Sequence, residues 1–249
     1  MGENTVVTIN PTLPANISTF EKIVVSHLMV LFGLGMLLAI INQPYFDQVY
    51  TVEDGVLEWL TVMMFGQTAT VCWMRAWRLR GVKPAHFILV LCVTGFVFIF
   101  GLGEELSWGQ RLFDWESSSF FAENNAQGES NLHNLIIGDQ KVNKWVFGKG
   151  IAIFFITYLA VLVPLYSKTN KVKAVVDRLA IPIPKPYQAW ALLGILIGVE
   201  LIMKTFSETL RRGEMTEFAA SVVVMLIVLF PKNAEMFNLN SVCKPQTQS

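Results

Sequence analysis

Charged residues are scarce in this chain. They make up only 15% of its 249 residues, whereas soluble domains carry about 25%. The formal net charge is zero, so nothing in the sequence resembles the basic surface of a nucleic-acid-binding protein, and we expect no nucleic-acid partner. Hydrophobic residues account for 53% of the chain. This balance predicts a membrane protein whose main partner is the lipid bilayer.

The sequence also lacks the residues of several familiar catalytic centres. Its three cysteines, Cys72, Cys92 and Cys243, have neither disulfide-framework nor metal-ligand spacing. It has no HExxH motif, no pair of histidines at helical metal-ligand spacing and no convincing Ser-His-Asp set. These absences argue against a zinc metalloprotease and a serine hydrolase.

What the chain does contain is long apolar segments, and six of them are candidates to cross a membrane. We predict an all-α, polytopic membrane protein that forms a single transmembrane domain over residues 1–249. The first segment is too long for a signal-peptide core and lacks a small-x-small cleavage site, so we expect it to be retained. The third and sixth segments reach a spanning length only if their polar flanks join the helix. The predicted spans are residues 23–41, 56–73, 87–102, 146–165, 189–203 and 218–230.

The charges of the connecting loops predict the orientation. All charged residues of the link between spans two and three are basic, and the link between spans four and five has one acid, Asp177, among five bases. Short basic loops remain in the cytoplasm. The intervening segments are acidic or mixed, and the longest is the outward loop, residues 103–145. The sequence therefore predicts that both termini are cytoplasmic and that three loops face outward.

Carboxylates gather at the predicted outward ends of the spans. The candidate catalytic residues are Glu58, Glu104, Glu105, His133 and Glu217. If span two begins at the start of VEDGVLEWLT, Glu58 lies roughly 10 Å into its helix. An ionisable group at that depth is costly and indicates a functional site. For acids near helix N-termini, such as Glu53, Asp54 and Glu214, a stabilising role toward the helix dipole is the alternative.

A second group of polar residues follows span three in the sequence GLGEELSWGQR. If that helix continues, Glu104, Ser107, Trp108 and Arg111 share one face. Gln110 and Arg111 are then candidates to orient a phosphate or sugar head group. Trp108 is a further candidate substrate contact, although a residue of the interfacial aromatic belt is the simpler interpretation.

Three segments resemble a known group of proteins. EDGVLEWLT, GEELSWGQRLF and GESNLHNL are similar to sequences of bacterial multi-pass membrane proteins to which no activity is attached. The resemblance covers spans two and three and the outward loop, under half of the chain. It implies a bacterial inner (cytoplasmic) membrane and a common role for the three motifs, but it supplies no mechanism.

Three functions fit these observations. The first is an enzyme acting on a lipid or lipid-linked substrate, with a divalent cation held by Glu58, Glu105 and His133. Oxygen-rich ligation with one imidazole suits Mg²⁺, Mn²⁺ or Ca²⁺; a carboxylic acid beside an ionised carboxylate is the metal-free alternative. The second is an ion-coupled transporter that uses Glu58, Glu200 and Lys204. The third is an envelope scaffold or assembly factor that binds a protein partner through Phe120 and Phe121.

Overall fold

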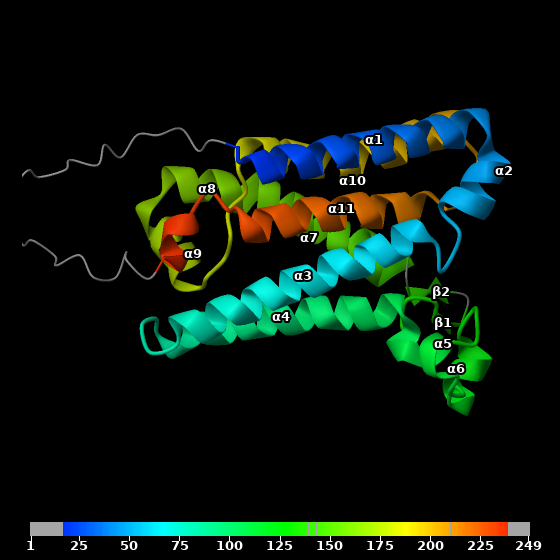
Figure 1. Cartoon of the computed structure of the whole chain (residues 1–249), viewed down its shortest axis with the longest axis horizontal. Coiled ribbons are helices and arrows are strands. Elements are labelled where there is room, and N and C mark those ends of the chain that lie inside the picture. The colour runs from blue at the N-terminus through cyan, green and yellow to red at the C-terminus, as the bar shows by residue number, and fades with distance from the viewer. Residues whose placement is uncertain (1–16, 139, 143, 210, 239–249) are drawn as a thin grey trace, which may run out of the picture.

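The chain folds into an elongated bundle of helices that run along its length (Figure 1). The computed structural model describes residues 17–138, 140–142, 144–209 and 211–238 and is 76% helical. The helices are α1 (Thr19–Ile41), α2 (Gln43–Tyr45), α3 (Val56–Leu79), α4 (Ala85–Glu105), α5 (Gln110–Phe113), α6 (Ser119–Asn124), α7 (Ile151–Thr157), α8 (Val163–Lys168), α9 (Asn170–Arg178), α10 (Pro186–Phe206) and α11 (Arg212–Leu229).

Short elements of other kinds complete the chain. A two-residue antiparallel pair, β1 (Ile136–Ile137) and β2 (Gln140–Lys141), lies in the long loop after α6. The 3-10 segments are η2 (Ser107–Gly109) and η5 (Ala234–Phe237), and the π-helical segments are η1 (Phe46–Tyr50), η3 (Lys144–Gly150) and η4 (Tyr158–Leu162). The segments η3, α7, η4 and α8 follow one another directly, and together they give one helix over Trp145–Lys168.

In the part of the chain that the structure describes, four helices are long and apolar enough to cross a membrane: Thr19–Ile41, Ala85–Glu105, Trp145–Lys168 and Pro186–Phe206. Much of their apolar surface is exposed. In Trp145–Lys168, none of the most apolar stretch is buried within the protein. Soluble proteins rarely expose apolar patches larger than a few hundred Å², so this surface fits a hydrocarbon environment. The prediction of a helical transmembrane protein is confirmed at this level.

Helix α11 forms the centre of the bundle. Its apolar residues are buried on all sides, and it packs against α1, α3 and α10 (Figure 1). A helix that is hydrophobic around its whole circumference is stable only when it is enclosed by others. Its buried positions include Met215, Phe218, Val222 and Leu226. This enclosure fixes where the N-terminal turns of α11, which carry Glu214 and Glu217, meet the other helices.

The predicted extension of the third and sixth spans by polar residues is confirmed. Helix α4 continues to Glu105, and α11 begins at Arg212, six residues before the predicted start of its span. The linker before α10 is extended from Ile181 to Lys185, as its prolines predict, and Pro186 opens the helix.

A buried ion pair joins the first turns of α1 and α10. The Lys185 Nζ lies 2.8 Å from the Glu21 Oε1, and the Tyr187 hydroxyl donates to the same oxygen at 2.6 Å. Ser18 caps α1 and Glu21 bonds back to the Ser18 amide, which completes a capping box. Glu21 therefore both caps α1 and joins it to the start of α10.

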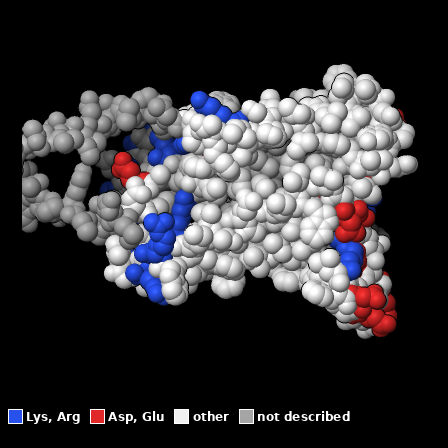
Figure 2. Space-filling view, viewed as in Figure 1, with Lys and Arg blue, Asp and Glu red and all other residues white. Residues whose placement is uncertain are grey.

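The two ends of the bundle differ in charge. In Figure 2, Lys and Arg gather at one end, where the α3–α4 turn and α9 lie, and Asp and Glu gather at the other. We call these the basic end and the acidic end. The acidic end also holds α2, α5, α6 and the β1–β2 pair (Figure 1).

Candidate functional site

The acidic end brings together three potential metal ligands from distant parts of the chain. Glu105 is the last residue of α4, His133 lies in the loop after α6, and Glu217 lies in the second turn of α11. One ligand atom from each residue lies within 4.8 Å of the other two. All three side chains are partly buried. Within the described part of the chain, neither carboxylate accepts a hydrogen bond or forms an ion pair, so both are available to a ligand.

The metal set predicted from the sequence was Glu58, Glu105 and His133. The structure brings ligand atoms of Glu105, His133 and Glu217 to within 4.8 Å of one another, and Glu58 lines the same pocket without belonging to this group. Helix α3 begins at Val56, so Glu58 lies in its first turn, about 3 Å along the axis. The depth of roughly 10 Å inferred for Glu58 is therefore wrong. Its position at a helix N-terminus is one that favours an anion.

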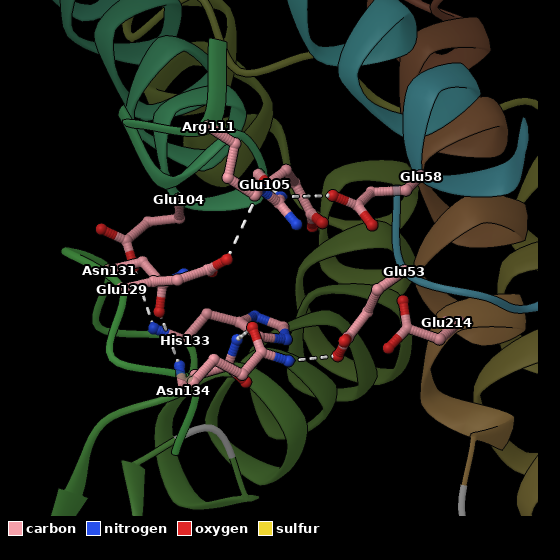
Figure 3. A pocket seen from close by; sticks show the side chains of 11 residues that line it. Glu53, Glu58, Glu104, Glu105, Arg111, Glu129, Asn131, His133, Asn134 and Glu214 are labelled. Carbon is pink, nitrogen blue, oxygen red and sulfur yellow. Dashed lines mark hydrogen bonds and ion pairs between the residues drawn. The ribbon is translucent and has the colours of Figure 1, made fainter. Parts of the chain in front are cut away.

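Arg111 organises the carboxylates around this cluster (Figure 3). Its Nη1 lies 2.8 Å from the Asp54 carboxylate, and its Nη2 lies 3.0 Å from the Glu58 carboxylate. Its Nε lies 3.5 Å from the Glu129 carboxylate. It also donates to the Glu105 carbonyl oxygen at 3.0 Å. Burial lowers the pKa of Arg111, but the carboxylates outweigh it and hold the pKa above its ordinary value. The guanidinium thus joins the start of α3, the end of α4 and the long loop.

Glu104 positions the loop that carries His133. Its carboxylate is buried and accepts the backbone amides of Leu132 and His133 at 2.6 and 3.0 Å, together with the Trp108 indole N–H at 3.0 Å. Three donors on one carboxylate leave little capacity for a substrate. Glu104, a candidate catalytic residue from the sequence, is therefore placed to hold His133 against Glu105.

The loop itself is fixed by a network of buried polar groups. Asn131 is 2% exposed, donates to the Ser107 hydroxyl at 2.8 Å and accepts from the Asn134 amide at 2.9 Å. The Ser107 hydroxyl donates to Glu129 at 2.5 Å, and Asn125 donates to Asn131. Buried polar groups that are satisfied in this way give a segment one defined conformation, so the NLHN segment is rigid around His133.

The other predicted substrate-binding residues also have internal partners. The Gln110 Oε1 accepts from the Ser117 hydroxyl and the Ser130 amide at 3.1 and 2.8 Å. Trp108 donates to Glu104, although 47% of its surface remains exposed. Arg111 is shared among three carboxylates. Binding a head group through Gln110 or Arg111 requires these contacts to break.

The expected continuation of α4 through Arg111 is wrong. The helix ends at Glu105, and Ser107, Trp108 and Gly109 all have positive φ values, 49°, 55° and 81°. This left-handed conformation reverses the chain and costs about 1–2 kcal/mol for each residue that is not glycine. The reversal turns Trp108 back toward α4 and brings Arg111 over the helix end.

Comparison with protein-family models, with curated proteins and with solved structures finds no match. The chemistry of the site therefore depends on its geometry alone.

The site carries an excess of negative charge. The pocket is lined by six acids, one arginine, one histidine and three amides, namely Glu53, Glu58, Glu104, Glu105, Arg111, Gln127, Glu129, Asn131, His133, Asn134 and Glu214 (Figure 3). Carboxylates this close repel one another in a medium of low dielectric constant. A cation relieves the repulsion, and carboxylate oxygens with one imidazole are ligands that suit Mg²⁺, Mn²⁺ or Ca²⁺.

Glu200, Lys204, Glu208 and Arg211 follow one another at helical spacing in the sequence, but they do not share one helix face in the structure. Helix α10 ends at Phe206, so Glu208 and Arg211 do not continue the helical spacing of Glu200 and Lys204. The Lys204 Nζ lies 2.8 Å from the Glu200 carboxylate; the Lys204 side chain is largely exposed and that of Glu200 is about half exposed. Arg212 also reaches Glu200, at 3.2 Å.

Sequence reasoning missed Glu129, Gln127 and Asn125 as parts of the site. Glu129 joins Arg111 to Ser107. The Gln127 side chain accepts a hydrogen bond from Asn134 in the loop and donates one to Glu53, just before α3. These residues lie in a loop with no periodic pattern. The one available signal was that GES directly precedes NLHN in the chain.

Proposed function

We propose that the chain is a six-span membrane protein of the bacterial inner membrane that binds a divalent cation on Glu105, His133 and Glu217 and acts on a lipid or lipid-linked substrate. The observation that carries the proposal is the approach of these three ligand atoms to within 4.8 Å of one another. They come from α4, α11 and the long loop, so no local sequence preference explains their meeting.

Packing supports six spans in place of four. Helix α3 runs antiparallel along the length of α4, and α11 runs along α10 (Figure 1). A helix that lies beside a spanning helix over its whole length crosses the same layer. Charge supports the orientation, because the basic end fits the cytoplasm under the positive-inside rule. The cation site then faces outward.

The position of the cluster supports a lipid-linked substrate. Glu105 is the last residue of a spanning helix and Glu217 is in the second turn of another, so the site lies where head groups meet the hydrocarbon layer. A cation there would polarise a carbonyl or phosphoryl oxygen of the head group and lower the pKa of a bound water. Three protein ligands leave coordination positions open for both.

The residues of the site would have two roles, binding the ion and accepting a proton. Glu105, His133 and Glu217 would hold the ion. Glu58 lies beside the same pocket, where it can accept a proton once Arg111 orients it. Glu104 acts through the loop that it positions and is not expected to touch the substrate.

A transporter is less consistent with the structure. Glu200 and Lys204 neutralise each other on an exposed helix face, and neither lines the pocket that contains Glu58. This separation from the pocket argues against a relay between these residues and Glu58.

A scaffold is the second candidate, and one observation favours it. Phe120 and Phe121 pack edge to face with their ring centroids 5.4 Å apart, and Phe120 is 53% exposed on α6. Exposed aromatic pairs are frequent in protein interfaces. A scaffold predicts that partner binding is lost in a Phe120→Ala/Phe121→Ala variant and is retained in Glu105→Gln.

The decisive experiment is elemental analysis of the protein purified in nanodiscs after incubation with Mg²⁺, Mn²⁺ or Ca²⁺ and removal of free ion. We expect close to one equivalent of ion in the wild type and almost none in Glu105→Ala or Glu217→Ala, because each variant loses one of three ligands. Glu123→Ala is the matched control, since Glu123 is an exposed acid on α6 that does not line the pocket.

Two results would contradict the proposal. One is the absence of stoichiometric ion from the wild type under all three conditions. The other is an equal loss of ion in Glu123→Ala, which would show that the ion is held by the general negative charge of the loop.

A further inference from the structure

A groove lies on the opposite part of the molecule, on the α3 face near the basic end. It is lined by Thr70, Trp73, Met74, Trp77 and Arg78 and has a volume of about 310 Å³, at the lower end of the ~300–1,000 Å³ range of small-molecule sites. The other four lining residues lie three, four, seven and eight positions after Thr70, so all five share one face of the helix. That face is mostly apolar and ends in a charged residue.

The wall of the groove is rigid. The Trp73 indole N–H donates to the Cys92 carbonyl oxygen at 3.3 Å, and its ring packs against Phe96 with centroids 5.3 Å apart. Gly95 makes this possible, because a Cβ at that position would lie 2.3 Å from the Trp73 Nε1. Trp73 is therefore held against α4, and the groove beside it is a fixed feature of the α3–α4 hairpin.

Positive charge gathers at the end of the groove. Arg78 is exposed, and among the described residues it has no ion-pair or hydrogen-bond partner. The Arg80 guanidinium lies 3.3 Å from the ring centroid of Trp77, which holds a second cation beside the first. Lys83 follows in the same turn, over the ring of Phe87. The α3–α4 turn has no acid to neutralise these charges.

We propose that this groove binds an anionic phospholipid, with an acyl chain along Met74 and Trp77 and the phosphate on Arg78 and Arg80. The charge of the site selects the head group, and the apolar face of α3 receives the chain. Tryptophan side chains are typical of the depth at which head groups and hydrocarbon meet, and basic pockets at one end of spanning helices recognise anionic head groups. The site is at the far end of the bundle from Glu105 and does not depend on the cation cluster.

Native mass spectrometry of the delipidated protein, titrated with phosphatidylglycerol or phosphatidylcholine of the same chain length, tests the proposal. We expect a saturable first phosphatidylglycerol adduct and much weaker binding of phosphatidylcholine. Arg78→Ala should weaken the first adduct about fivefold, as expected for loss of one basic contact at a membrane surface. Trp77→Ala should weaken binding of both lipids, because it removes the apolar contact and the support of Arg80.

Lys171→Ala is the matched control, since Lys171 is an exposed base of α9 at the same end of the molecule but outside the groove. Arg78→Lys keeps the charge and should retain most of the binding, which separates loss of the site from misfolding. Equal binding of the two lipids, or an equal loss in Lys171→Ala, would overturn the proposal. So would a stable dimer that dissociates in Trp77→Ala, because the face would then belong to a second copy of the chain.

Discussion

Arg111 is the residue on which the architecture of the acidic end depends most. It is 27% exposed at the side chain, whereas Glu58 and Glu129 are 9% and 14% exposed. Removing one partner from a buried ionic group leaves uncompensated charge, which costs more than the pair itself contributes. The three carboxylates that Arg111 contacts, those of Asp54, Glu58 and Glu129, would therefore destabilise the fold without the guanidinium.

We predict that Arg111→Met lowers the free energy of unfolding by about 2 kcal/mol, a value reduced from that of fully buried pairs because solvent screens part of the charge. Thermal unfolding in detergent should show a fall of roughly 5 °C for a chain of this size. Arg111→Lys should recover part of the loss, since one ammonium cannot bridge three carboxylates as a guanidinium does.

The double variant Arg111→Met/Glu58→Gln gives the internal control. Neutralising Glu58 should restore part of the stability lost in Arg111→Met, because the two side chains interact directly at 3.0 Å. Strict additivity of the two substitutions would show that the contact contributes nothing to the fold.

At the scale of the element, the end of α4 determines how the site is assembled. Gly103 faces the Trp108 ring, and a Cβ on it would lie 2.8 Å from the ring carbons. Only glycine lets Trp108 fold back and donate to Glu104. Glu104 in turn holds the amides of Leu132 and His133. A single small residue therefore links the end of a helix to the position of His133.

Gly103→Ala should displace Trp108 and destabilise the protein by about 1–3 kcal/mol, as overpacking does. It should also weaken binding of the cation, because the Glu104-bound loop shifts with Trp108. Gly194→Ala is the matched control: a Cβ there meets nothing within 4 Å, so stability should be unchanged or slightly raised. Unaltered melting and ion content in Gly103→Ala would refute this chain of contacts.

The helices were predictable because long apolar segments leave few alternatives in a membrane. Each predicted span corresponds to a helix in the structure, and even the polar extension of α4 to Glu105 followed from the length that a span requires. The break after Glu105 was not predictable in the same way. It depends on consecutive left-handed residues, of which only Gly109 has a sequence signature.

The candidate site was only partly predictable for a related reason. Glu105 and Glu217 could be assigned to the same end of the molecule from helix direction alone. Whether Glu217 or Glu58 lies beside His133 depends on how α11 rotates against α3 and on where a loop of irregular structure returns. Periodicity contains no information about either, and it likewise gave no sign that Glu104 would be occupied by backbone amides.

At the scale of the whole molecule, the separation of charge between the two ends is the property that relates the fold to the membrane. The basic end holds the proposed lipid groove, and the acidic end holds the cation cluster (Figure 2). Each site fits the ionic character of the end at which it lies, so both proposals assign a leaflet. Both proposals therefore depend on the basic end of the molecule facing the cytoplasm.

Reporter fusions measure that orientation directly. An alkaline phosphatase inserted after Gly128, in the loop between α6 and β1, should be active because the enzyme matures only in the periplasm. The same reporter inserted after Lys171, at the start of α9, should be inactive, because basic segments remain in the cytoplasm. A cytoplasmically active reporter at the two positions should give the reciprocal pattern and control for expression. The inverse result would place the cation cluster in the cytoplasm and the lipid groove in the outer leaflet. Activity of the phosphatase at both positions would show that Trp145–Lys168 does not cross the membrane, because this single crossing between the two positions would place them on opposite sides.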